Sequence, residues 1–242
     1  TVTGSKIWSF SVDNLSASQP SRVWSSPAVV GNIVYVGSGY TMAQNYYSSS
    51  GIGYVYALDA STGAKIWNYT VSDCVDSSPA VINGVLYVGS WDNYIYALNI
   101  ANGNLLWRTN LGGRVSASPA VVNNIVYISS FDKNIYALNA QTGAKIWNYS
   151  TGDIVDSSPT VAGNVVYVGS CDHYFYALNA TTGAKVFSYQ TGYPVESSAA
   201  VANGVVYVGS NDGKLYAFGT VTPTPTPSPT PSPSPTATPT AT

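Results

Sequence analysis

Charged residues are scarce in this sequence of 242 residues, and their scarcity excludes several classes of protein. Only 8% of the residues are Asp, Glu, Lys or Arg, against roughly 25% in a typical soluble protein. Nine basic and eleven acidic residues leave a net charge of −2. This composition excludes a basic nucleic-acid-binding protein, because contact with phosphates needs clustered cations. It favours self-association or a cover of glycans, because few charges keep copies apart.

Histidine, cysteine and long apolar runs are also nearly absent. A single histidine, His173, excludes a metal site built from several histidines. Cys74 and Cys171 lack the spacing of a zinc or thiol redox motif. A disulfide between them and two free thiols are both open. No apolar run approaches the roughly 18 residues that a membrane-spanning helix needs, so we expect no membrane span in this segment.

Internal repetition, by contrast, is abundant. The tripeptide Tyr-Ala-Leu or Tyr-Ala-Phe recurs every 40 residues, beginning at Tyr56, Tyr96, Tyr136, Tyr176 and Tyr216. A second anchor, Ser-Ser-Pro or a relative, ends at Pro27, Pro79, Pro119, Pro159 and Ala199. The first step between these anchors is 52 residues and the others are 40. Anchors that stay in phase over several units indicate repeated structural units.

Each unit is predicted to form four short antiparallel strands. In the second unit, residues 77–83, 85–90, 94–99 and 104–110 are rich in β-branched and aromatic residues, with turn residues between them. Four strands every ~40 residues are typical of a propeller blade. We therefore predict an all-β, five-bladed β-propeller over residues 1–220. Residues 221–242 are rich in Pro, Thr and Ser and are predicted to be an extended linker or stalk.

The two ends of the repeat region are predicted to meet. The last unit stops after residues 215–218 without a fourth strand, whereas residues 4–10 read as a fourth strand without a unit. An unpaired blade edge exposes backbone donors and acceptors. We predict that the N-terminal strand completes the last blade. Pairing between different copies of the chain, which would build a polymer, stays open as the alternative.

The repeats resemble a known family at the turn that precedes the last strand of each unit. The pattern Ala57-x-Asp59-x-x-Thr62-Gly63-x-x-x-Trp67 is similar to the tryptophan-docking motif of quinoprotein-type, or PQQ-like, propeller repeats. Over residues 4–218 the resemblance implies that one aromatic residue of each unit packs between neighbouring blades. The residues at this position are Trp8, Trp67, Trp107, Trp147 and Phe187.

The resembled family includes PQQ-dependent dehydrogenases, outer-membrane assembly lipoproteins and surface proteins of unknown role. Its dehydrogenases have more blades, a disulfide of adjacent cysteines beneath the cofactor and a calcium ion held by Glu, Asn and Asp. This chain has five units and no adjacent cysteines. We therefore expect no catalytic residues and no cofactor, and a PQQ-dependent enzyme is the least favoured alternative.

Acidic residues recur at two positions of the repeat. Asp76, Asp156 and Glu196 lie three residues before the second anchor and should ring one mouth of the channel, where they are weak candidates for a Ca²⁺ site. The favoured interpretation is a solvated ring, because the repeat itself sets their spacing. A second set is interpreted as turn residues whose carboxylates accept backbone N–H bonds: Asp92, Asp132, Asp172 and Asp212.

Two features suggest surface contacts. The extra length of the first unit falls in residues 39–53, whose Tyr, Ser and Gly are typical of adaptable contact loops, with Tyr40, Tyr46 and Tyr47 as candidate contact residues. A tolerated loop insertion is an equal alternative. Candidate N-glycosylation sequons begin at Asn14, Asn68, Asn148 and Asn179.

These observations favour a non-catalytic, extracellular or cell-surface structural propeller. We expect its partners to be copies of itself in a filament or surface layer, with the Pro/Thr-rich tail as a linker. The alternative is a head on a stalk that binds glycans or proteins through residues 39–53.

Overall fold

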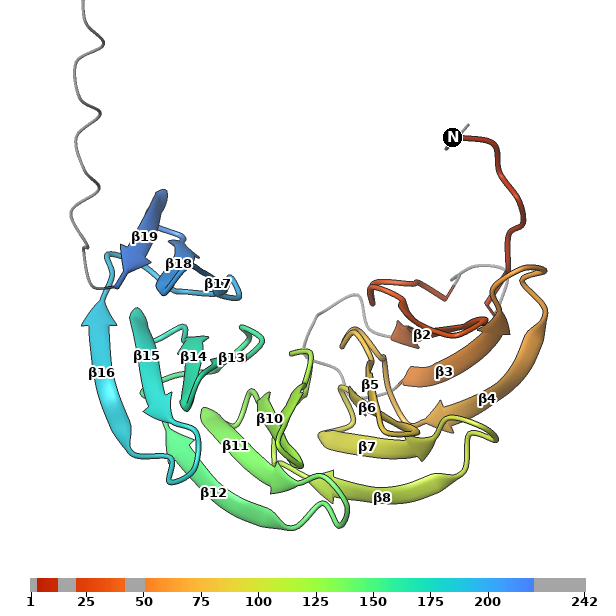
Figure 1. The fold of residues 1–242 in the computed structure, drawn as a ribbon, viewed down its shortest axis with the longest axis horizontal. Helices are drawn as coiled ribbons and strands as arrows, with labels where there is room; N and C mark the ends of the chain where they lie inside the picture. The colour runs from red at the N-terminus through yellow and green to blue at the C-terminus, as the bar shows by residue number, and fades with distance from the viewer. Residues whose placement is uncertain (1–3, 13–20, 42–50, 220–242) are drawn as a thin grey trace, which may run out of the picture.

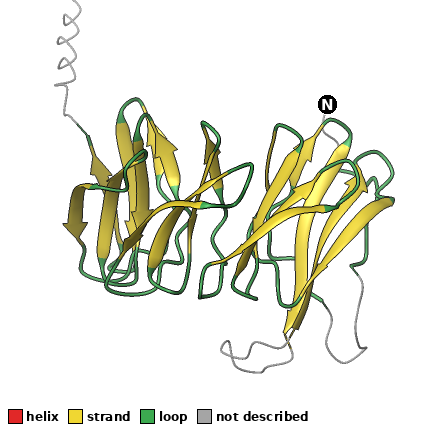
Figure 2. Cartoon of the chain, turned by 90° about the horizontal axis from the view of Figure 1, so that it is seen from below, coloured by secondary structure: helices red, strands yellow, loops and turns green. Residues whose placement is uncertain are grey.

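The computed structural model describes residues 4–12, 21–41 and 51–219 of the chain. These residues form β-strands, turns and loops and no helix, as Figure 2 shows, so the all-β prediction is confirmed. No described segment is a helix that could cross a membrane.

The strands form five antiparallel sheets in chain order, which are the five predicted blades (Figure 1). Blade 1 contains β1 (Ala28–Val30), β2 (Ile33–Thr41), β3 (Gly51–Asp59) and β4 (Lys65–Val71). Blade 2 contains β5 (Ala80–Ile82), β6 (Val85–Gly89), β7 (Tyr94–Asn99) and β8 (Leu105–Asn110). Blade 3 contains β9 (Ala120–Val122), β10 (Ile125–Ser129), β11 (Asn134–Asn139) and β12 (Lys145–Ser150). Blade 4 contains β13 (Thr160–Ala162), β14 (Val165–Gly169), β15 (Tyr174–Asn179) and β16 (Lys185–Gln190). Blade 5 contains β17 (Ala200–Ala202), β18 (Val205–Ser210) and β19 (Lys214–Phe218).

The core lies between neighbouring blades. In one buried cluster, Ile95 and Trp107 of blade 2 pack with Val126 and Leu138 of blade 3. Equivalent clusters join the other neighbouring blades. Burial therefore depends on a blade having a neighbour, as in other repeat proteins whose units contact only the next unit.

A ladder of hydrogen bonds joins the inner ends of the blades and explains the Ser-Ser-Pro anchor. In each step, the backbone N–H of one serine donates to the side-chain oxygen of the equivalent serine in the next blade, at 2.8–3.0 Å. The serines of the ladder are Ser26, Ser78, Ser118, Ser158 and Ser198. The ladder has a direction, with a donor on one side of each blade and an acceptor on the other.

The prediction that the N-terminal strand completes the last blade is wrong within a single chain. Within the part of the chain that the structure describes, blade 5 has three strands, β17, β18 and β19, and residues 4–12 form no strand. The indole of Trp8 instead docks on blade 1, donating to the carbonyl of Ala60 at 2.9 Å. Figure 1 shows the N-terminal segment and β19 at opposite ends of an open arc. The packing between neighbouring blades sets a small rotation per blade, and the rotations of five blades do not add up to a full turn.

Candidate functional site

Each docking tryptophan lies on the turn of the blade that follows it, and three of them, Trp67, Trp107 and Trp147, lie between two blades. The indole N–H groups of Trp8, Trp67, Trp107 and Trp147 donate, each at 2.9 Å, to the carbonyls of Ala60, Ile100, Ala140 and Ala180. Phe187 has no such donor, and its ring packs against Phe175 and Phe218, with ring centroids 6.4 and 5.8 Å apart. These contacts are structural, because they satisfy the indole donor while burying the ring.

The turn that receives each tryptophan is shaped by an acceptor side chain and a glycine. The Asp59 carboxylate accepts side-chain and backbone hydrogen bonds from Ser61 and Thr62, which lower the pKa of Asp59 to about 2. At Gly143, φ is +71°, and an added Cβ would lie 2.5 Å from the Trp107 ring. Only glycine combines this backbone conformation with so close an approach.

The recurring turn acids also act within the fold. The Asp92 carboxylate accepts the backbone N–H of Tyr94 at 3.1 Å and the hydroxyl of Tyr96 at 2.6 Å. Asp212 accepts the Tyr216 hydroxyl at 2.6 Å, and this bond is the main reason that its pKa is lowered to about 2. Their interpretation as turn residues agrees with these contacts.

The three candidate calcium ligands do not converge. Asp76 and Asp156 line one cavity, whereas Glu196 lies beside Cys171, whose Sγ is 3.9 Å from Glu196 Oε1. Within residues 4–12, 21–41 and 51–219, no three carboxylates, thiols or imidazoles gather closely enough to hold a metal ion. The 40-residue repeat spreads these acids over separate blades.

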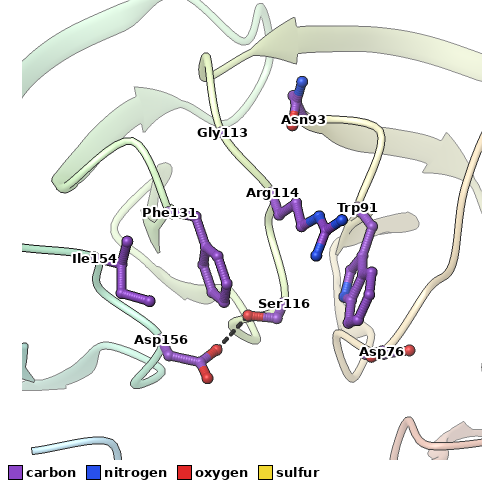
Figure 3. A pocket seen from close by; sticks show the side chains of 9 residues that line it. All are labelled: Asp76, Trp91, Asn93, Gly113, Arg114, Ser116, Phe131, Ile154 and Asp156. Atoms are coloured by element: carbon purple, nitrogen blue, oxygen red, sulfur yellow. Dashed lines mark hydrogen bonds between the residues drawn. The ribbon is translucent and has the colours of Figure 1, made fainter. Parts of the chain in front are cut away.

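Asp76 and Asp156 share a cavity within the described structure. It measures about 530 Å³ and is lined by loops of blades 2, 3 and 4, as Figure 3 shows. The residues that line it are Asp76, Trp91, Asn93, Gly113, Arg114, Ser116, Phe131, Ile154 and Asp156. Its volume is within the range of ligand pockets, roughly 300–1,000 Å³.

Charge and aromatic rings meet in this cavity. The guanidinium carbon of Arg114 lies 4.5 Å from the centroid of the Trp91 ring, a cation–π contact. The Ser116 hydroxyl donates to the Asp156 carboxylate. Burial raises the pKa of Asp76 to about 7, with further contributions from the negative charges of Asp73 and Asp156 that outweigh the opposing effect of Arg114.

Sequence reasoning found the acids of this cavity and missed its aromatic and basic residues. Trp91 and Phe131 each stand directly before a recurring turn aspartate, where the two later units have Cys171 and Asn211. A large aromatic residue at a repeat position that varies between units was the feature of the sequence that could have pointed to these two cavity residues. No feature of the sequence pointed to Arg114, because its place beside Trp91 depends on how blades 2 and 3 pack.

The disulfide considered between Cys74 and Cys171 is not formed, and both residues are free thiols. Cys74 is buried at the boundary of blades 1 and 2, where its atoms would meet a Cβ built on Gly39. Cys171 lies at the turn after β14 in blade 4. Burial is the main cause that raises the pKa of Cys74 to about 12 and that of Cys171 to about 11, so neither is an activated nucleophile.

The candidate contact loop is described only at its base. The backbone of Tyr40 pairs with Ile52, so the insertion lengthens the hairpin of β2 and β3. Tyr46 and Tyr47 lie outside the described residues, as do Asn14 and the linker at 221–242.

The other three sequon asparagines differ in their surroundings. Asn68 and Asn148 are exposed on the outer strands β4 and β12, although the Asn148 amide also donates to Asn134 Oδ1 at 3.0 Å. The side-chain oxygen of Asn179 accepts the backbone N–H groups of Thr181 and Thr182. Asn179 is thereby held in a docking turn, which makes Asn68 and Asn148 the more accessible acceptors.

Comparison with protein families identifies the repeats. The profile of a family described as outer membrane protein assembly factor BamB matches residues 1–111, 52–154 and 92–222 in overlapping segments. These segments together cover the whole repeat region. No curated protein matches the chain significantly.

Solved structures share the fold at low sequence identity. BamB from Moraxella catarrhalis is 21% identical, with a TM-score of 0.66 over 82% of this chain and 59% of that chain. The quinohemoprotein alcohol dehydrogenase ADHIIG from Pseudomonas putida HK5 is 21% identical, with a TM-score of 0.63 over 82% of this chain and 40% of that chain. The computationally designed Ika4 protein is 18% identical, with a TM-score of 0.54 over 58% of this chain and 88% of that chain. These likenesses concern the fold, and the match spans less than two thirds of the BamB chain.

Proposed function

The chain belongs to the PQQ-like propeller-repeat family described as outer membrane protein assembly factor BamB, and on that premise we propose that it is a non-catalytic structural module that joins head to tail with copies of itself. In this proposal, the free face of blade 5 in one copy packs on the free face of blade 1 in the next. The N-terminal segment of the second copy then supplies the fourth strand of blade 5.

The observation that carries this proposal is the exposure of an inter-blade face at blade 5. Leu215 occupies the repeat position of Ile95, Ile135 and Phe175, which pack against the following blade and are fully buried. Leu215 is 75% exposed. The same face carries Tyr207, which is 37% exposed, whereas its counterparts Tyr87 and Tyr127 are 3% exposed.

Blade 1 presents the complementary face. Val29 of β1 is 61% exposed, whereas its counterparts Val81 and Val121 pack against the preceding blade. Trp8 and Phe10 cover the outer part of this face, packing with buried Tyr56. The residues 4–12 therefore lie where the outer strand of a preceding blade belongs.

The occupant that fits both faces is a second copy of this chain. The two faces are opposite sides of an interface that the chain itself forms between each pair of neighbouring blades. The serine ladder can also continue from one copy to the next. Within the ladder, Ser198 accepts through its hydroxyl and Ser26 donates through its backbone N–H. The backbone N–H of Ser198 in one copy could therefore donate to the hydroxyl of Ser26 in the next. Contacts that repeat without closing on themselves build fibres, whereas those that close build rings.

A non-catalytic role is supported by the use of the recurring acids. Asp92, Asp172 and Asp212 each hold a tyrosine hydroxyl and a backbone N–H group within the fold. We place the module outside the cell or at the cell surface, because its low charge suits an uncharged polar surface and residues 221–242 have the composition of an extracellular linker. N-linked glycans at Asn68 and Asn148 belong to the same proposal.

The test is the molar mass of the protein over a wide range of concentration, measured by light scattering. We expect the mass to rise with concentration for the wild-type chain and to stay at the monomer value for Leu215→Asp, which places a charge on the blade 5 face. Ile146→Asp is the matched control, because Ile146 is 48% exposed on the outer strand of a central blade. Ile146→Asp should associate like the wild type.

Two results would overturn the proposal. One is a wild-type chain that stays monomeric at every concentration. The other is a Leu215→Asp variant that associates as strongly as the wild type and the Ile146→Asp control. Electron microscopy of the associated material would then distinguish open filaments from closed rings.

A further inference from the structure

The cavity between blades 2, 3 and 4 is complete within one chain, so what it binds is independent of self-association. Its lining residues belong to the loop that joins blade 1 to blade 2 and to loops of blades 2, 3 and 4, all within one chain. Its shape therefore does not require a second copy.

Aromatic side chains form two walls of this cavity. Figure 3 shows Phe131 on one side and Trp91 on the other, with Arg114 reaching between them and Ser116 below. Two neighbours hold Trp91 in position. The Arg114 guanidinium lies over its ring, and the centroid of the Trp24 ring lies 6.4 Å from that of Trp91. Walls of this kind suit a ligand with a flat, weakly polar C–H face.

The polar groups of the cavity include both donors and acceptors. Trp91 is 7% exposed, and its indole N–H, which can only donate, has no hydrogen-bond partner among the described residues. Arg114 adds further donors, whereas Asp76 and Asp156 offer carboxylate oxygens as acceptors. A cation would leave the Trp91 donor unsatisfied, and an anion would face two carboxylates. Hydroxyl groups match both kinds of partner, because each can donate and accept.

From this lining we infer that the cavity is a binding site for a neutral, hydroxyl-rich ring compound, namely a mono- or disaccharide. The ring would lie between Phe131 and Trp91. Its hydroxyls would donate to Asp76 and Asp156 and accept from Arg114 and from the Trp91 indole.

The protonation of Asp76 is compatible with such a ligand. A carboxyl group with a pKa of about 7 is partly protonated near neutral pH, so it can either donate to or accept from a hydroxyl. Its negative neighbours are Asp73 and Asp156, and Arg114 is the nearby positive group.

The experiment is isothermal titration calorimetry with glucose, galactose, mannose, N-acetylglucosamine, maltose and cellobiose, each titrated into the full chain. We expect at least one to bind the wild type in the millimolar range or tighter. Asp156→Asn should weaken binding about tenfold, because a hydrogen bond to a charged group is lost. Trp91→Phe keeps a ring but removes the donor, and it should weaken binding several-fold.

Glu196→Gln is the matched control, because Glu196 occupies the same repeat position as Asp156 but does not line the cavity. It should bind the saccharide like the wild type. Melting curves of all variants separate lost binding from lost folding.

The inference is overturned if none of the six saccharides binds the wild type, or if binding survives unchanged in Asp156→Asn. It is also overturned if Ca²⁺, titrated alone, binds in an Asp156-dependent manner while the saccharides do not, since the carboxylates would then serve a cation.

Discussion

The central blades and the end blades carry the same strand motif, yet the same motif position is buried in one and exposed in the other. Ile135 in blade 3 is fully buried, whereas Leu215 in blade 5 is 75% exposed. Both residues are aliphatic, and both lie on the third strand of their blade. The difference therefore comes from the neighbour, which Ile135 has in blade 4 and Leu215 lacks among the described residues.

The comparison teaches that stability in this molecule resides in the contacts between blades. A blade is a small sheet that cannot bury both of its faces alone, so each added neighbour buries one more face. The end blades should consequently be the first to open, and substitutions in them should cost less than equivalent ones in the centre.

The largest expected effect is at a central docking tryptophan. Trp107→Ala should lower the free energy of unfolding by about 3–5 kcal/mol, because it leaves a cavity between blades 2 and 3 and removes the indole bond to Ala140. Trp8→Ala should cost about half as much or less, because Trp8 anchors a segment that forms no strand. Denaturant titration of dilute protein measures both. Equal losses would contradict the distinction between centre and end.

A smaller effect is expected at the glycines of the turns. Gly143→Ala combines a left-handed backbone, at φ +71°, with a Cβ 2.5 Å from the Trp107 ring, whereas Gly213→Ala has a similar φ of +81° and no atom within 4 Å. Both should lose about 1 kcal/mol for the backbone, and Gly143→Ala should lose about 1–3 kcal/mol more by overpacking. Thermal melts of the pair isolate the contact between blades. Variants of equal stability would show that the docked tryptophan yields freely.

A third comparison is a dependence on pH of opposite sign in the two regions. Because the folded pKa of Asp76 is raised to about 7, the stability that it contributes is present below about pH 4 and is lost as the pH rises through 7. Asp212 in blade 5 has a folded pKa of about 2, so its contribution is present above about pH 4 and is lost as the pH falls through 2.

Melting temperatures of two variants measure this contrast. Asp76→Asn should gain stability relative to the wild type between pH 5 and pH 8, whereas Asp212→Asn should be less stable than the wild type at pH 7 and approach it toward pH 2. A wild-type chain and an Asp76→Asn variant with parallel profiles between pH 5 and pH 8 would refute the assignment for Asp76.

The strands and docking residues could be predicted from the sequence because their signals are local and repeated. Tyr96, Tyr136 and Tyr176 mark the same strand in successive units, and a glycine stands four residues before each of the four docking tryptophans. The aspartates of the turns were likewise predictable, since Asp92 bonds to residues two and four positions along the chain.

The site was predicted only in part. Asp76 and Asp156 were expected at one mouth, because they hold the same position of the repeat. Arg114 and Trp91 come from different positions of different units and meet only because blades 2 and 3 pack side by side. Of the two states left open for the cysteines, the structure shows free thiols, because Cys74 is buried against Gly39 at the boundary of blades 1 and 2 whereas Cys171 lies on blade 4.

The repeat period, the order of the strands and the contacts of each blade with its neighbours could be predicted from the sequence, because each depends on short-range spacing that recurs along the chain. Ring closure and the assembled cavity could not, because they depend on the rotation between blades, a small angle that the packing of whole side-chain layers sets and that accumulates from one blade to the next. A change in this angle that is too small to disturb any single contact between blades decides whether residues 4–12 reach β19 or lie at the far end of an arc.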